Sequence, residues 1–164
     1  MRGYPERVKF ALNVFGWVDP WGLRRGKAYA PANVNIIIGA NGEVLSATAR
    51  IRRGNLGQGT PTSRSSRNAA RCMGKKEDDA GHILAKLLGG LGHLAQGVFP
   101  KNPHINRGAY RVFEGRVADA VRKHGAVDVN IHWIYGNGGT RPTDIIYEVS
   151  HVNGTLILSH MLGN

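Results

Sequence analysis

The chain of 164 residues contains a single cysteine, Cys72, and only 11 Asp and Glu against 22 Lys and Arg. One cysteine excludes an intrachain disulfide and a zinc site built from several thiolates, so any metal ion must bind oxygen or imidazole ligands. No apolar run reaches the roughly 18 residues that a membrane-spanning helix needs, and no charged segment precedes a short apolar one near the N-terminus. The sequence therefore predicts neither membrane insertion nor a signal peptide.

The length fits one domain with a core of its own. The net charge of +11 is uneven, because residues 1–77 hold 14 basic and 4 acidic residues, whereas residues 78–164 hold 8 and 7. Residues 50–76 contain no Asp or Glu, and their basic residues are Arg50, Arg52, Arg53, Arg64, Arg67, Arg71, Lys75 and Lys76. Such a segment favours a polyanionic partner, because each Lys or Arg that meets a phosphate releases condensed counterions. A solvated basic loop, or a surface that meets an acidic protein, would show the same composition.

Five segments have the residue pattern of β-strands. Residues 34–38 and 44–51 are rich in β-branched side chains and flank an Asn-Gly pair, which predicts a two-stranded antiparallel ribbon. Residues 127–135 alternate between apolar and polar side chains, and strands over 144–149 and 155–159 follow after glycine-containing turns. We therefore expect an antiparallel meander to close the domain.

The middle of the chain is predicted to be helical and irregular. Residues 54–66 are rich in Gly, Ser, Thr and Pro, which indicates a mobile surface loop. Residues 82–88 predict a short helix that ends at a Gly-Gly pair. A longer helix is expected after Asn106, because apolar residues recur at steps of three and four: Ala109, Val112, Phe113, Val117, Ala120 and Val121. The opposite face of that helix would carry Arg107, Arg111 and Glu114.

These segments carry candidate groups for phosphodiester hydrolysis, which needs a base for the attacking water and a cation for the developing charge. His82 follows a glycine, and an imidazole with a pKa of about 6.5 suits a general base. The amide oxygen of Asn106 suits Mg²⁺, which binds few protein ligands and keeps much of its water. Glu114 could orient water on the ion, while Arg107 and Arg111 contact phosphate.

Each of these residues also has a structural interpretation. A histidine beside acidic residues is commonly a surface group, an asparagine before a helix is commonly an N-cap, and Arg and Glu three residues apart commonly form a solvated ion pair. The residues alone therefore leave open two other classes of protein. One is a nucleic-acid-binding module without catalysis, and the other is a basic adaptor for an acidic protein.

Four short motifs together resemble a known family. They are Asp79-Ala80-Gly81-His82, Val98-Phe99-Pro100, Asn106-Arg107-Gly108-Ala109-Tyr110 with Glu114, and Arg141-Pro142 before Ile145 and Tyr147. Over about residues 34–160, their order and spacing resemble the DNA/RNA non-specific endonucleases of the ββα-metal superfamily, in the form found as toxin domains. The resemblance implies an α+β fold, with a ββα-metal core, an N-terminal β-ribbon and a C-terminal antiparallel meander.

The same resemblance implies roles for three residues. His82 would activate the attacking water, Asn106 would bind Mg²⁺ or another divalent cation such as Mn²⁺ directly, and Glu114 would help to order water on the ion. Cleavage would leave a 5′-phosphate on DNA, with RNA left open as a second substrate.

The motifs depart from the family pattern at two places. Ala80 stands where an Asp-Arg-Gly-His motif has its arginine, and Gly97-Val98-Phe99-Pro100-Lys101 stands where the family has Asn-x-x-Pro-Gln. The contact to phosphate must then come from another basic residue upstream of the motif or in the connection, for which the candidates are Arg67, Arg71 and Lys101. A nucleic-acid-binding module whose nuclease site has decayed is the alternative that these departures keep open.

Residues 15–23, Phe-Gly-Trp-Val-Asp-Pro-Trp-Gly-Leu, resemble the end of an Rhs-repeat shell, after which the toxin begins. A turn that packs its aromatic residues on the domain is the alternative. The resemblance implies that residues 1–23 are a remnant of the shell and residues 24–164 the nuclease toxin domain. It also implies a secreted effector that enters the cytoplasm of a competing cell. Because such a toxin endangers its producer, we expect an acidic immunity protein to cover the basic cleft.

Overall fold

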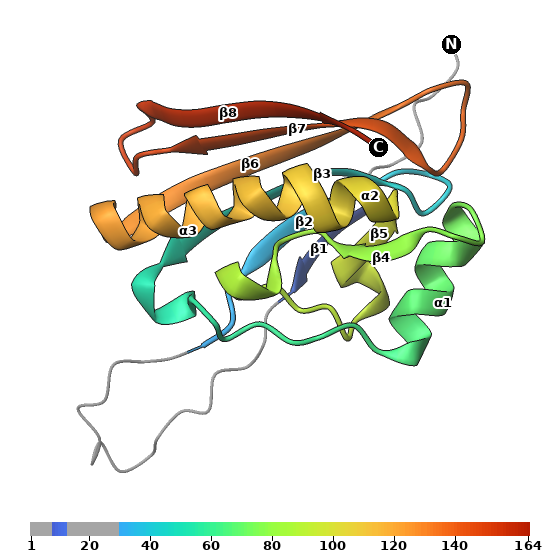
Figure 1. Cartoon of the computed structure of the whole chain (residues 1–164), viewed down its shortest axis with the longest axis horizontal. Coiled ribbons are helices and arrows are strands. Elements are labelled where there is room, and N and C mark those ends of the chain that lie inside the picture. Colours follow the sequence, from blue (N-terminus) through green and yellow to red (C-terminus); the bar gives the residue numbers. More distant parts are fainter. Residues whose placement is uncertain (1–7, 13–29) are drawn as a thin grey trace.

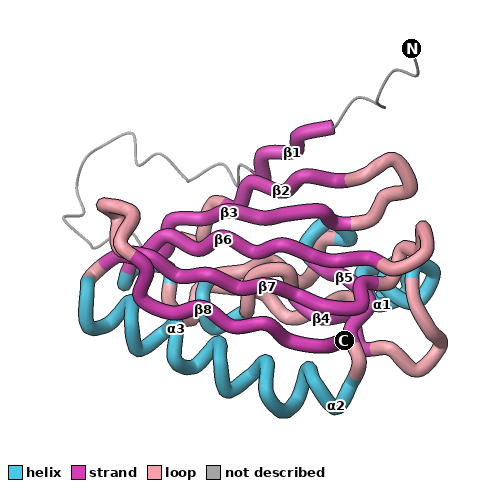
Figure 2. Tube along the Cα trace, turned by 90° about the horizontal axis from the view of Figure 1, so that it is seen from above, coloured by secondary structure: helices cyan, strands magenta, loops and turns pink. Residues whose placement is uncertain are grey.

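The computed structural model describes residues 8–12 and 30–164. Six antiparallel strands form one sheet in the order β1-β2-β3-β6-β7-β8, side by side in Figure 2. The strands are β1 (Val8–Leu12), β2 (Val34–Ile38), β3 (Val44–Arg52), β6 (Ala126–Tyr135), β7 (Pro142–Ser150) and β8 (Leu156–Gly163). The predicted ribbon and the predicted meander are both confirmed, and pairing of β3 with β6 joins them into one sheet.

The core lies between this sheet and the long helix α3 (Arg111–His124), which runs along one face of the sheet in Figure 1. The alternation expected from the sequence is confirmed in β6, where Val129, Ile131 and Trp133 are at most 5 % exposed. Successive side chains of a strand point to opposite faces, so the polar residues between them lie on the face that α3 does not cover. From α3, Phe113 and Val117 pack into the same core.

At the N-terminal end of the long helix, the residues that face inward differ from those predicted. Tyr110 is fully buried, whereas Val112, which was expected inside, is 67 % exposed. The chain enters α3 through the short helix α2 (Pro103–Ile105) and the kinked turn η4 (Asn106–Tyr110), in which Gly108 has non-helical backbone angles. The kink at Gly108 interrupts the regular helical repeat, so residues before and after it do not follow a single inward-facing stripe.

A second, two-stranded sheet lies near the N-terminal end of α3 and consists of β4 (Asp79–His82) and β5 (Val98–Lys101). His82 therefore ends a strand, and the helix predicted over residues 82–88 is wrong. Only the 3-10 turn η2 (Lys86–Leu88) forms there, and it ends at a left-handed glycine. β4, β5 and the following helical segment together form the ββα unit.

The helix α1 (Arg64–Met73), which was not predicted, packs on the β4–β5 hairpin. It begins inside the segment that was expected to be a loop, because the Ser63 side chain accepts a hydrogen bond from the Ser66 amide and caps the helix. Two further 3-10 turns, η1 (Arg53–Asn55) and η3 (Ala95–Gly97), lie in the connections.

Residues 15–23, which resemble the end of an Rhs shell, lie outside the described residues. β1 falls within residues 1–23 and pairs with β2 of the nuclease sheet. The division into residues 1–23 and 24–164 stays a prediction. None of the helices in residues 30–164 has the length and apolar character that a membrane span requires.

Candidate active site

A cleft lies where the end of β4, the η2 turn and the η4–α3 segment meet. Its lining residues are His82, Ala85, Lys86, Leu87, Asn106, Arg107, Arg111 and Glu114. Five residues singled out from the sequence therefore lie together, although they come from separate segments. Their assignment to particular roles stays a prediction.

His82 is held by the backbone of residue 60. Its Nε2 lies 2.8 Å from the carbonyl oxygen of Thr60. A carbonyl only accepts hydrogen bonds, so Nε2 carries the hydrogen and Nδ1 is left as the acceptor atom. Burial lowers the pKa of His82, the hydrogen bond to Thr60 opposes this, and the charges of Lys101 and Lys86 lower it further. The imidazole is therefore neutral at neutral pH, as a general base must be.

The carbonyl that holds His82 belongs to the segment expected to be a mobile loop, and this segment is anchored. The Thr60 amide donates to the Gly90 carbonyl at 3.0 Å, and the Gly92 amide donates to the Thr60 carbonyl at 3.2 Å. The Thr60 hydroxyl lies 2.7 Å from Nδ1 of His93. Gly92 also lies against the His82 ring, where a side chain would overlap the imidazole. No feature of the local sequence marked Thr60 or Gly92 for this role.

Asn106 is oriented by Asp79, a motif residue to which no role was given from the sequence. The Asn106 Nδ2 donates to Asp79 Oδ2 at 3.0 Å, which leaves the amide oxygen free to accept or to bind a cation. Arg107 donates to both carboxylate oxygens of Asp79, at 3.1 and 2.8 Å. Burial raises the pKa of Asp79, but the hydrogen bonds from Arg107 and Asn106 outweigh it, so the net pKa is below its ordinary value. Asn106 is the first residue of η4 and has helical backbone angles, so it is not the N-cap of α3.

Glu114 lies on the inward side of α3, one α-helical turn after the buried Tyr110, and is half-buried. Burial raises the pKa of Glu114 to about 7, and the positive charge of Lys101 acts in the opposite direction. With a pKa of about 7, the Glu114 side chain is only partly ionised at neutral pH, unlike a solvated surface carboxylate.

Lys101 corrects one prediction, because it is only 1 % exposed and cannot reach a phosphate in the cleft. Its Nζ lies 3.1 Å from the ring centroid of Tyr110 and 4.8 Å from that of Phe99. Gly81 makes this enclosure possible, since a side chain there would overlap the Lys101 chain. Burial lowers the pKa of Lys101 to about 7, and the charges of Glu114 and Asp79 oppose the decrease.

The remaining basic candidates fall into two groups. Arg107 and Arg111 line the cleft, whereas Arg67 and Arg71 lie on α1 and do not. Arg67 donates to the Thr62 carbonyl at 3.0 Å, and the charge of Arg71 helps to lower the pKa of Asp79. Contacts of these arginines with phosphate stay predictions. Lys86 also lines the cleft, and sequence reasoning missed it because a single lysine in a short turn carries no pattern.

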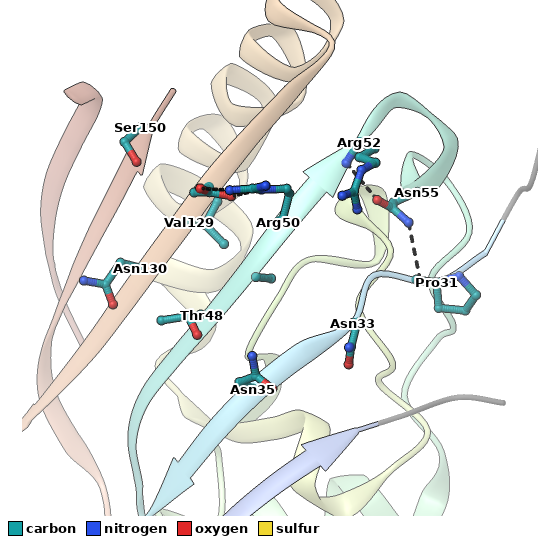
Figure 3. A pocket seen from close by; sticks show the side chains of 12 residues that line it. Pro31, Asn33, Asn35, Thr48, Arg50, Arg52, Asn55, Val129, Asn130 and Ser150 are labelled. Atoms are coloured by element: carbon teal, nitrogen blue, oxygen red, sulfur yellow. Dashed lines mark hydrogen bonds and ion pairs between the residues drawn. The ribbon is translucent and has the colours of Figure 1, made fainter. Parts of the chain in front are cut away.

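A wider hollow lies on the face of the main sheet that α3 leaves uncovered (Figure 3). Polar side chains of β2, β3 and β6 line it, among them Asn35, Thr48 and Asn130. Arg50 is bound there to both carboxylate oxygens of Asp128, at 2.7 and 2.8 Å. None of the candidate catalytic residues borders this hollow.

A ββα unit with a neutral histidine on its first strand and an asparagine at the start of its helical segment defines the ββα-metal class of nuclease folds. The sequence profile of the family described as DNA/RNA non-specific endonuclease matches residues 35–153. The chain belongs to this family. The predicted fold class is thereby confirmed.

One relative and three solved structures extend the comparison. "Probable deoxyribonuclease RhsA" of Dickeya dadantii (strain 3937) is 45 % identical over 162 residues, which cover 99 % of this chain but only 11 % of that protein. NucA of Streptococcus agalactiae without metal is 18 % identical, with a TM-score of 0.54 over 82 % of this chain and 71 % of that one. The magnesium-bound form of NucA is 16 % identical, with a TM-score of 0.53 over 85 % of this chain and 74 % of that one. A structure titled "extracellular endonuclease" is 14 % identical, with a TM-score of 0.57 over 97 % of this chain and 82 % of that one. These structural likenesses show the fold.

Proposed function

We propose that the chain is a Mg²⁺-dependent endonuclease that hydrolyses DNA without sequence preference, with RNA left open as a second substrate, and that it acts as an antibacterial toxin. The observation that carries this proposal is the cleft that His82, Asn106 and Glu114 share. Family membership supports nuclease activity, and the name of the Rhs relative supports DNA as substrate.

The side chains of the cleft fit a hydrated Mg²⁺ ion. Asn106 offers an amide oxygen whose partner nitrogen is fixed on Asp79, and Glu114 adds a carboxylate in the same cleft. Mg²⁺ prefers oxygen ligands and keeps several waters, so this short donor set is sufficient. When bound, the ion would stabilise the negative charge that develops on the phosphate and on the leaving oxygen. The magnesium reported for one NucA structure supports this choice of ion.

His82 performs the proton transfer in this proposal. Its Nδ1 accepts a proton from water as the water oxygen attacks phosphorus, while Nε2–H stays bound to the Thr60 carbonyl. That carbonyl fixes the tautomer before the reaction and stabilises the imidazolium cation after it. The bond from phosphorus to the 3′ oxygen breaks, the 3′ oxygen takes a proton from solvent to become a hydroxyl, and the 5′-phosphate remains on the other product. His82 then returns its proton to solvent. Arg107 and Arg111 line the same cleft as Asn106 and would contact the phosphate there.

The biological setting is proposed from the Rhs relative, whose C-terminal part matches this chain. We place the chain at the end of an Rhs protein, as a secreted effector that is delivered into the cytoplasm of a competing cell. An acidic immunity protein would neutralise a domain of net charge +11 by covering its cleft. This partner is inferred from the toxicity of a nuclease to its producer.

Cleavage of a supercoiled plasmid in Mg²⁺, with and without chelator, tests the proposed function. Wild type should cut the plasmid, chelator should stop the reaction, and His82→Ala should bind DNA but not cut it. His132→Ala is the matched control, because His132 is an exposed histidine on β6 outside the cleft. Cleavage that resists chelator, or a His82→Ala variant as active as wild type, would refute the mechanism. Binding without any cleavage by wild type would favour the decayed nucleic-acid-binding module.

A further inference from the structure

The η2 turn supplies one side of the active-site cleft, and the η4–α3 segment supplies the other residues around His82. Within the turn, Lys86 and Leu87 line the cleft and are exposed, with Leu87 at 41 %. Their neighbours Ala85 and Leu88 are buried, at 4 % and 0 % exposure. The turn is thus anchored at both ends and presents one cationic and one apolar side chain to the cleft.

The backbone of the turn is fixed by its surroundings. The Gly57 amide donates to the Leu87 carbonyl at 2.8 Å, and the Gly89 amide donates to the Lys86 carbonyl at 3.1 Å. Gly59 packs so closely on the Lys86 backbone that a side chain at residue 59 would overlap the Lys86 carbonyl. Because the backbone of the turn is held in one conformation, less conformational entropy is lost when a side chain on it binds a ligand.

The charges around the cleft leave Lys86 available for an anion. Arg107 is held by Asp79, and Lys101 is enclosed by Tyr110 and Phe99. Within residues 30–164, neither Lys86 nor Arg111 takes part in an ion pair. Lys86 is also close enough to His82 for its charge to lower the pKa of the imidazole.

We propose that Lys86 binds a phosphate group of the nucleic-acid backbone in the cleft and thereby supplies the positive charge that Ala80 lacks. The assignment rests on the proposed nuclease function of the same cleft. A backbone phosphate is the anion that a nuclease brings within reach of its base, and an ammonium group binds phosphate as a point charge. Leu87, next to Lys86, offers an apolar contact to the sugar or base of the same nucleotide.

Binding of a short labelled DNA duplex in chelator measures this contact without cleavage. The logarithm of the association constant changes with the logarithm of salt concentration by about −0.9 per phosphate contact, so one contact contributes about eightfold at 0.1 M salt. Lys86→Ala should therefore lose about eightfold in affinity, its salt dependence should fall by about one contact, and Lys86→Arg should restore both. Lys123→Ala is the control, because Lys123 is exposed and lies about 18 Å along α3 from Arg111.

Steady-state cleavage in Mg²⁺ gives the second measurement. Lys86→Ala should raise KM by a similar factor and change kcat by less than about twofold, as expected for a contact made equally before and during the reaction. Lys86→Ala and Lys123→Ala with equal affinity and equal KM would overturn the phosphate contact while leaving the nuclease function intact. If wild type binds duplex but does not cut it, a selective loss in Lys86→Ala would uphold the contact and refute the nuclease. Failure of wild type to bind duplex would refute both.

Discussion

Replacing Lys101 by methionine is expected to stabilise the fold, because methionine has a similar length and no charge to bury. An unfolded lysine has a pKa of about 10.4, whereas burial lowers that of Lys101 to about 7. At about 1.4 kcal/mol per pKa unit, a charged Lys101 destabilises the fold by about 5 kcal/mol, and by about 4 kcal/mol at pH 7, where part of it is neutral. The variant also loses the contact of the ammonium with the Tyr110 ring, which contributes about 1–2 kcal/mol. We therefore expect a net gain of about 2–3 kcal/mol.

The destabilisation by Lys101 should depend on pH in a defined direction. The pKa of Lys101 is lower in the folded state, so the destabilisation is complete below pH 7 and disappears as the pH rises toward 10.4. The advantage of Lys101→Met over wild type should accordingly shrink between about pH 7 and about pH 10. Urea unfolding in chelator at several pH values measures the difference, with Lys123→Met as an exposed control that should change by less than about 0.5 kcal/mol. A less stable Lys101→Met, or an advantage that does not change with pH, would refute the reasoning.

The same substitution should impair activity at neutral pH. Burial raises the pKa of Glu114 to about 7, and the charge of Lys101 is the influence that lowers it. Without Lys101, the Glu114 carboxyl should stay protonated at neutral pH and bind a cation poorly. We expect a variant that is more stable yet less active, with activity recovering as the pH is raised. Activity equal to wild type at neutral pH would show that Lys101 does not support Glu114.

Two further substitutions address the supports of the cleft. Asp79→Ala should weaken Mg²⁺ binding at least about tenfold in calorimetric titration, because the Asn106 amide loses its fixed orientation; unchanged affinity would count against this role. Arg141→Met should lower the free energy of unfolding by about 3–5 kcal/mol near pH 7, because Asp78 is 1 % exposed and would lose its cationic partner. Burial raises the pKa of Asp78, but hydrogen bonds from Arg141 and the Lys75 amide hold it below its ordinary value. The stability that this ion pair contributes should therefore be lost as the pH falls below about 4. A stability difference between wild type and Arg141→Met that persists in acid would contradict this account.

The strands could be predicted from the sequence because their burial follows a short repeat. In β6, residues 127, 129, 131 and 133 alternate with polar residues, and the same residues are buried in the fold. The segment 82–88 was misread for the opposite reason. Its buried residues, Ile83, Leu84, Ala85 and Leu88, pack into the core shared by the main sheet and α3, not along a helical repeat, so local periodicity carried no information about its conformation.

Arg107, Arg111 and Glu114 line one cleft, as their spacing predicted, but the kink before α3 could not be predicted. A regular helix through Ala109, Val112 and Phe113 would bury Val112. The turn η4 instead has non-helical backbone angles at Gly108, Tyr110 is buried and Val112 is 67 % exposed. The turn is held in part by Asn106 and Arg107, which bond to Asp79 at sequence separations of 27 and 28. Such a contact cannot be read from a window of neighbouring residues.

The departures at Ala80 and Lys101 make sense when the charges of the cleft are considered together. Asp79 is balanced by Arg107, and Glu114 lies within the electrostatic influence of the buried Lys101. Arg107 therefore compensates the charge of Asp79, and Lys86 and Arg111 remain as additional positive charges that line the cleft. These charges would attract a polyanion before any divalent ion binds, so the missing motif arginine does not leave the cleft without positive charge. An acidic inhibitor that covers the cleft would gain from the same field, and this is the reason for proposing an acidic immunity protein.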